Sequence, residues 1–323
     1  MERQVAIVGA GLIGRAWSVS FARGGCAVRL YDPVAGVAEA AHAALPAMLA
    51  ELAAHDLLGG QSPAEVHART RVCDSLAAAL DGAEHVQESA PERLPEKRAL
   101  FSELDARAAP DAVLCSSTSS LLPSAFSDHL AGRARVLVGH PINPPCLVPA
   151  VEIVPAPWTD PQVVERTADL MIAIGQKPIR MTREIDGFIM NRLQGALLQE
   201  AFRLVAAGIA SAEDVDIGIR DGLGLRWAFM GPFETIDLNA PGGIADYIAR
   251  YEGMFRLMAQ GQTAQVDWGG PLSETLEAER AAILPREGIA ARQAWRDRRL
   301  MALAAHRRAD RDEDETEART GGA

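Results

Sequence analysis

Two polar residues near the middle of the chain have types and positions suited to oxidising an alcohol. His140 follows an apolar run at residues 136–139, and Glu152 lies inside a second run at residues 151–154. A buried carboxylate is costly unless it has a partner, and His140 is the natural one. A Glu–His pair fixes the imidazole tautomer and stabilises the imidazolium, as a general base requires. One histidine among seven is more often incidental, so the hypothesis depends on the position of His140 after a strand.

A glycine-rich turn near the N-terminus is typical of dinucleotide binding. The segment GAGLIG fits the G-x-G-x-x-G spacing, follows a short apolar strand and opens a helix. The glycines permit a tight turn, close approach of the backbone to a pyrophosphate and close helix–strand packing, while the helix N-terminus offers N–H groups. A turn without a ligand is the alternative. We predict cofactor contacts at five residues: Gly9, Gly11, Leu12, Ile13 and Gly14.

An acidic residue after the second predicted strand favours one cofactor over another. Asp32 follows residues 27–31, and no Lys or Arg occurs between it and Arg69. A carboxylate here accepts hydrogen bonds from the adenosine ribose hydroxyls and repels a 2′-phosphate. The sequence therefore predicts NAD and disfavours NADP, and it predicts no metal site.

The elements that would position these residues form an alternating pattern. Strands are expected at residues 5–8, 27–31, 71–73, 85–88, 112–115, 136–139 and 151–154, with helical segments between them. This alternation predicts an α/β, Rossmann-type and mostly parallel sheet domain. From Asn191 on, apolar residues recur at helical spacing, which predicts an all-helical C-terminal domain. We expect domains at residues 1–187 and 188–308 and a disordered tail at 309–323.

Composition disfavours several classes of partner. The 323-residue chain has a net charge of -11, which is unsuited to nucleic acid or an anionic membrane surface. The sequence contains no window of about 18 uncharged apolar residues, so we expect no membrane span. The four cysteines are scattered and the N-terminus lacks an export signal, so we expect reduced thiols and a cytoplasmic protein.

Several motifs together resemble those of the 3-hydroxyacyl-CoA dehydrogenase family, in order and over nearly the whole chain. They are the glycine turn, S-x-T-S-S at 116–120, H-x-x-N-P at 140–144, V-E at 151–152 and D-G-F-I-x-N-R at 186–192. Alone, the 116–120 segment would be read as a polar loop.

The resemblance implies a role for each matching residue. It makes His140 the base and Glu152 its orienting carboxylate, and it places Ser119 and Asn191 at the substrate oxygens. It also implies contacts from Glu92 and Lys97 to the nicotinamide side of the cofactor. Lys97 is one of only two lysines, which favours this role, and an exposed helical lysine is the alternative.

Within the family, the chain resembles the lambda-crystallin branch most closely. The matching stretches are residues 140–145, 151–155, 183–188, 222–235 and 238–240. This implies oxidation of the C3 hydroxyl of L-gulonate to 3-dehydro-L-gulonate, and we place the substrate carboxylate at Arg226, for which a surface role is the alternative. Acyl-CoA members present lysines for the CoA phosphates, whereas residues 30–68 here contain no Lys or Arg.

Other outcomes stay open at this point. The substrate could be L-carnitine or 3-hydroxybutyryl-CoA, or the chain could be a non-catalytic crystallin-like protein. The family resemblance also implies a homodimer through the helical domain. The stripe of Leu193, Leu197 and Leu204 is as compatible with an internal core as with a subunit interface.

Overall fold

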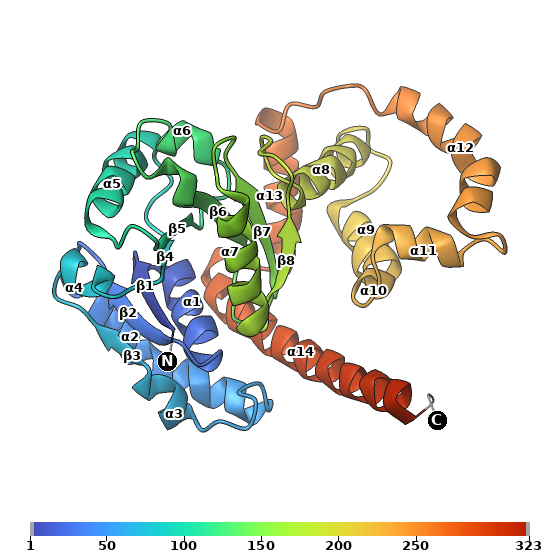
Figure 1. Cartoon of the computed structure of the whole chain (residues 1–323). Helices are drawn as coiled ribbons and strands as arrows, with labels where there is room; N and C mark the ends of the chain where they lie inside the picture. Colours follow the sequence, from blue (N-terminus) through green and yellow to red (C-terminus); the bar gives the residue numbers. More distant parts are fainter. Residues whose placement is uncertain (1–2, 321–323) are drawn as a thin grey trace. The chain divides into compact units, whose positions relative to one another are not determined.

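The structure, a computed structural model, describes residues 3–320, and the side chains of residues 3–308 (Figure 1). The chain divides into two compact units. The first unit comprises Met1–Asn191 together with Asp297–Ala323, and the second comprises Arg192–Arg296. The predicted boundary after residue 187 lies close to the observed one, but the end of the chain returns to the first unit.

An eight-stranded sheet forms the centre of the first unit, in the order β3-β2-β1-β4-β5-β6-β7-β8. Neighbouring strands are parallel except for β6 and β7, so the predicted Rossmann-type, mostly parallel sheet is confirmed. Strand β8 was not expected from the sequence, because it is short and carries charged residues at both ends. The strands are β1 (Gln4–Val8), β2 (Ala27–Tyr31), β3 (Thr70–Val72), β4 (His85–Glu88), β5 (Val113–Ser116), β6 (Val136–Pro141), β7 (Ala150–Pro155) and β8 (Lys177–Arg180).

Helices cover both faces of this sheet because alternate side chains of each strand point to opposite sides. Val5 and Ile7 of β1 join the core formed with α1, α2 and α7, whereas Ala6 and Val8 join the core formed with α4, α5 and α6. The helices are α1 (Leu12–Arg23), α2 (Val37–Ala54), α3 (Pro63–Ala68), α4 (Leu76–Leu80), α5 (Leu94–Arg107), α6 (Pro123–Ser127) and α7 (Pro161–Ala173), with a 3₁₀ turn at Arg133–Arg135.

Helix α2 is long and apolar enough by length and composition to cross a membrane, with a mean hydropathy of 1.2. Its buried residues Leu45, Leu49 and Leu52 pack into the core shared with α1 and the sheet. Apolar side chains of α2 therefore help to cover the sheet.

The second unit is helical, as predicted. Its elements are α8 (Met190–Ala206), α9 (Ala212–Ile217), a π-helical segment (Gly218–Leu223), α10 (Gly224–Trp227), α11 (Pro232–Leu238), α12 (Gly243–Gly261), α13 (Gly270–Ile283) and a 3₁₀ turn (Arg286–Gly288). Helix α14 (Ile289–Thr320) begins here and continues into the first unit, where Met301 is buried in the core. Residues 309–320 continue this helix where a disordered tail was expected, and residues 321–323 lie outside the described part.

Candidate active site

The glycine turn lies at the point where the order of the sheet reverses. Strand β1 is flanked by β2 and β4, and ligands bind in the crevice beyond the carboxyl ends of strands at such a point. Gly9 has a φ of +97°, and a Cβ added there would lie 2.7 Å from the carbonyl carbon of Ser89. A Cβ at Gly14 would lie 1.9 Å from the carbonyl oxygen of Gly9. At Gly11, an added Cβ would meet no described heavy atom within 4 Å, so this side of the turn is open to a ligand.

Asp32 is fixed directly beside this turn. Its Oδ2 accepts the N–H of Ala10 at 2.8 Å, and its Oδ1 accepts the N–H of Val34 at 2.9 Å. Each carboxylate oxygen keeps a further lone pair for a ribose hydroxyl. Leu12 starts α1 and is 67% exposed, while Ile13 packs against the core. The open glycine turn and the fixed acid fit the pyrophosphate and adenosine ribose of NAD.

The structure joins His140 and Glu152 in a buried pair. They occupy opposite positions on the antiparallel strands β6 and β7, and His140 Nδ1 lies 2.6 Å from Glu152 Oε2. An ionised carboxylate only accepts hydrogen bonds, so the imidazole proton stands on Nδ1 and Nε2 is left as the base. Glu152 Oε1 accepts the backbone N–H groups of Ile189 and Met190 at 2.6 and 2.8 Å. The orientation of the imidazole is thus set by a carboxylate that is itself held on both oxygens.

The turn into α8 connects this pair with two further predicted residues. Phe188 adopts the left-handed region with a φ of +51°, and its ring centroid lies 5.6 Å from that of His140. Such a conformation is uncommon for a bulky residue and persists where its surroundings demand it. Just beyond it, Asn191 Nδ2 donates to the carbonyl oxygen of Ser119 at 2.8 Å. Glu152 therefore anchors the helix start that carries Asn191, and Asn191 contacts the loop that carries Ser119.

Glu92 organises the serine-rich loop. Its Oε1 accepts hydrogen bonds from the Thr118 hydroxyl, from the backbone N–H of Ser119 at 2.8 Å, and from both the N–H and the hydroxyl of Ser120. Burial opposes ionisation of Glu92, but these hydrogen bonds outweigh it and lower its pKa. The carboxylate stays charged and fixes the loop that presents Ser119.

Lys97 is not the exposed helical lysine that the sequence left open. It is 2% exposed, and its Nζ donates to Glu88 Oε2 at 2.7 Å, to Glu88 Oε1 at 2.9 Å and to the Ser116 hydroxyl at 3.2 Å. The sequence analysis did not single out Glu88. The signal was present, because Glu88 is an acid at the end of a strand buried along its whole length, as Glu152 is within β7.

A row of buried and partly buried polar groups on β4 and just beyond the ends of β4 and β5 also escaped the sequence analysis. The Ser117 hydroxyl accepts from Gln87 Nε2 at 2.8 Å and from Trp17 Nε1 at 3.1 Å, and it lies 2.9 Å from the Ser89 hydroxyl. His85 Nε2 lies 3.0 Å from Gln87 Oε1, and burial lowers the pKa of His85 to about 4. This row fixes the strand ends on which the cofactor crevice is built.

Two other predictions concern the second unit. Arg226 lies on α10 of the second unit and is partly exposed. Leu193 and Leu197 of α8 are exposed in the single chain.

Binding of NAD and oxidation of a CH–OH group are the chemistry that this fold and this site serve, which makes the protein an NAD-dependent oxidoreductase. Residues 4–185 match the 3-hydroxyacyl-CoA dehydrogenase NAD-binding domain, and residues 187–269 match the C-terminal domain of the same enzymes. The chain belongs to the 3-hydroxyacyl-CoA dehydrogenase family.

Proteins similar to this chain carry the names of different activities or roles. A lambda-crystallin homolog of Bos taurus is 44% identical over 304 residues, covering 93% of this chain and 94% of the relative. An L-carnitine dehydrogenase of Streptomyces coelicolor is 40% identical over 250 residues, covering 77% of each chain. The solved structure of FHMPC 5-dehydrogenase, an NAD⁺-dependent dismutase, superposes with a TM-score of 0.80 at 27% identity, covering 94% of this chain and 97% of that one.

Proposed function

We propose that this protein oxidises the C3 hydroxyl of L-gulonate to 3-dehydro-L-gulonate with NAD. The observation that carries the proposal is the buried His140–Glu152 pair, with 2.6 Å between Nδ1 and Oε2, near the carboxyl end of β6 in the Rossmann-type sheet. The sugar-acid substrate is supported by the resemblance to the lambda-crystallin branch, of which the bovine relative covers nearly the whole chain.

In this reaction His140 Nε2 accepts the hydroxyl proton. The glycine turn at residues 9–14 and Asp32 would hold NAD⁺, which would supply the acceptor for the hydride from C3. Loss of a proton and a hydride converts the alcohol into a ketone. Glu152 stabilises the imidazolium that forms, as a hydrogen-bonded carboxylate does in other acid–base pairs. Ser119 and Asn191 hold the substrate oxygens, which reduces the search for a reactive geometry. Arg226 pairs with the substrate carboxylate.

There are three alternatives to an L-gulonate dehydrogenase. A CoA thioester is disfavoured because residues 30–68 contain no Lys or Arg for its phosphates. L-Carnitine is the stronger rival, since a relative with that activity in its name is 40% identical. A purely structural, crystallin-like role is disfavoured because the His140–Glu152 pair and its anchoring N–H groups are intact.

The test is NADH formation over L-gulonate, L-carnitine and 3-hydroxybutyryl-CoA. We expect the highest kcat/KM with L-gulonate. The variant His140→Asn keeps an N–H near the position of Nδ1 for Glu152 but lacks Nε2, so it should lose turnover and still bind NADH, as should the harsher His140→Ala. Loss of NADH binding in His140→Asn would refute the assigned role. Higher activity on L-carnitine would overturn the substrate but leave the base in place.

We also propose a cytoplasmic homodimer that forms through the helical unit. All four cysteines are buried, in keeping with thiols in a reducing compartment. Helix α12 exposes apolar side chains along its length, and a second copy would bury them. They are Ile244, Ile248, Tyr251, Met254, Phe255, Leu257 and Met258. A solution mass of two chains that falls to one in Phe255→Glu would support the dimer, whereas a monomeric wild type would refute it.

A further inference from the structure

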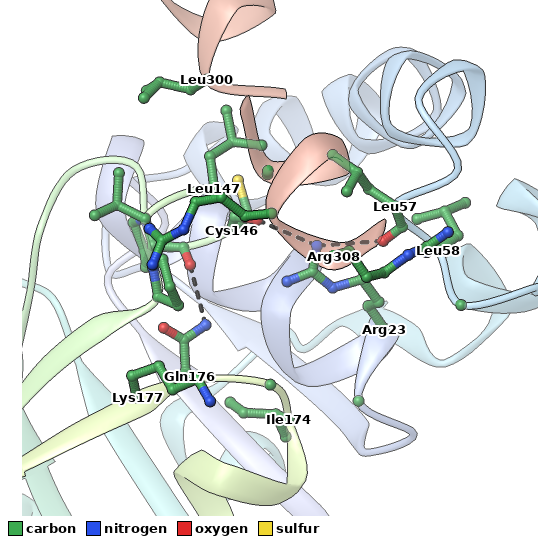
Figure 2. A pocket seen from close by; sticks show the side chains of 18 of the residues that line it. Arg23, Leu57, Leu58, Cys146, Leu147, Ile174, Gln176, Lys177, Leu300 and Arg308 are labelled. Carbon is green, nitrogen blue, oxygen red and sulfur yellow. Dashed lines mark hydrogen bonds between the residues drawn. The ribbon is translucent and has the colours of Figure 1, made fainter. Parts of the chain in front are cut away.

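The first unit contains a cavity of about 410 Å³ that none of the site residues above lines. Its walls come from five separate segments: the end of α1, the turn after α2, the loop between β6 and β7, the end of α7, and α14 (Figure 2). This volume lies within the range of small-molecule sites.

The charged residues that line this cavity are all basic. Arg23, Lys177, Arg307 and Arg308 line it, and the described lining residues include no Asp or Glu. Arg308 forms an ion pair with Asp56, which lies outside the lining. In a chain with a net charge of -11, a lining that holds Arg23 and Lys177 without an ion pair among the described residues stands out. This arrangement attracts an anion.

Arg23 contacts two of the segments that form the cavity. Its Nη1 donates to the carbonyl oxygens of Cys146 at 3.2 Å and Leu57 at 3.4 Å, both drawn as dashed lines in Figure 2. Among the described side chains no carboxylate pairs with it, and burial lowers its pKa. Gln176 also lines the cavity; it is 2% exposed, and its Oε1 has no hydrogen-bond partner in the described part of the chain. The partly buried cation favours a ligand with an anionic group. The free Gln176 Oε1 is an acceptor, so it would take a donor such as a water molecule or a hydroxyl group.

Apart from these residues and Gln61, the lining is mostly apolar. Cys146 is the thiol in this wall, and burial raises its pKa to about 11, so it stays protonated and is a poor nucleophile. The cavity therefore has the character of a binding site without covalent chemistry. Its aliphatic side chains are Leu57, Leu58, Leu147, Val148, Ile174, Leu300 and Leu303.

We propose that this cavity binds an amphipathic carboxylate, a molecule with one anionic end and a hydrocarbon body. Arg23 and Lys177 hold the carboxylate, and the aliphatic wall holds the chain. The occupant also stabilises the β6–β7 loop, because Arg23 donates to Cys146 and Gln176 donates to Pro145 at 3.0 Å within that loop. This site is independent of the proposed reaction, and its test needs no turnover.

The test is calorimetric titration of the full chain with octanoate, with octan-1-ol and inorganic phosphate as probes for the chain and the charge alone. We expect octanoate to bind, and each of the other probes to bind at least 10-fold more weakly. Lys177→Met removes a cation that no described side chain pairs with, and should weaken octanoate about 10-fold or more. Ala304→Phe fills the cavity from α14 without changing its charge, and should abolish binding. Arg107→Met, on an exposed face of α5, is the matched control and should leave binding unchanged.

Retained NAD binding shows that each variant is folded. Octanoate binding that survives Ala304→Phe would overturn the proposal, because the ligand would then sit elsewhere. Equal affinity for octan-1-ol would overturn it too, because the carboxylate would then contribute nothing to binding. Equal affinity for phosphate would overturn it because the hydrocarbon chain would contribute nothing. Octanoate should also slow amide exchange in residues 142–149, and unchanged exchange there would contradict the contact with the loop.

Discussion

The substitution Glu152→Gln tests the central geometry with the smallest possible change in shape. Glu152 uses both oxygens, Oε2 toward His140 Nδ1 and Oε1 toward two backbone N–H groups. A glutamine has one oxygen and one NH₂ group, so it cannot satisfy both sides. If its oxygen stays with Ile189 and Met190, its NH₂ faces Nδ1, and the imidazole proton must move to Nε2. The nitrogen that should accept the substrate proton is then already protonated.

The size of the effect follows from these alternatives. The equivalent exchange of Asp for Asn in a serine protease triad lowers kcat about 10⁴-fold through the wrong tautomer. In the opposite orientation, the amide NH₂ would face two N–H donors and leave them unsatisfied, at about 1–3 kcal/mol each. The first orientation is therefore favoured. We expect kcat to fall by about 10³-fold or more, with the Kd for NADH changed less than about threefold.

The assay is steady-state NADH formation on the best substrate, together with an NADH titration followed by fluorescence. Glu96→Gln is the control, because Glu96 lies on the surface of α5 in an ion pair with Arg93. A kcat for Glu152→Gln within 10-fold of the wild type, in a folded variant, would refute the argument. It would mean that the carboxylate does not set the tautomer of His140.

Three further perturbations have effects that the structure sets. Gly11→Ala should keep the wild-type Tm, because its new Cβ meets only open space in the protein, but it should weaken NADH binding about 10-fold or more, because that space is where the pyrophosphate would approach the turn. Gly14→Ala places a Cβ 1.9 Å from a carbonyl oxygen, so it should lower the Tm and also weaken NADH binding. Equal Tm values in the two variants would contradict this. Lys97→Met leaves Glu88 buried without its cation and should lower the free energy of unfolding in urea by about 3–5 kcal/mol. The double variant that also carries Glu88→Leu should recover most of this stability. A double variant as unstable as Lys97→Met would contradict the pairing. Burial lowers the pKa of His85 to about 4, so the folded protein resists protonation of this side chain. The contribution of His85 to the free energy of unfolding should therefore be complete above pH 6.5 and fall by about 3 kcal/mol between pH 6.5 and 4. His85→Gln should flatten this dependence on pH, and an unchanged dependence in that variant would refute the argument.

Local sequence features were sufficient for the cofactor half of the site. The glycine spacing, the strand before it and Asp32 after the next strand all act over a few tens of residues. The chemistry of a tight turn is therefore visible in residue order alone. The same holds for the alternation of strands and helices. Strand β8 was missed because it is short, carries charged residues at both ends and contains no buried residue.

Pairings over long separations were only partly predictable. His140 and Glu152 could be paired because a buried carboxylate demands a partner, and the structure places them opposite each other on β6 and β7. The same demand applied to Glu88, but its partner Lys97 lies on a helix, where an exposed position was equally plausible. The periodicity of α5 did not reveal which of its faces is covered.

The sequence by itself determined the class of fold, the cofactor and the types of the reacting groups, because each depends on short patterns or on the intrinsic chemistry of a side chain. The tertiary structure alone decided that Glu92 holds the serine loop, that the start of α8 is anchored on Glu152, and that α14 returns to close a cationic cavity on the first unit. Those features arise from segments far apart in the chain. Their contacts depend on how the packed sheet brings the segments together, which no local pattern encodes.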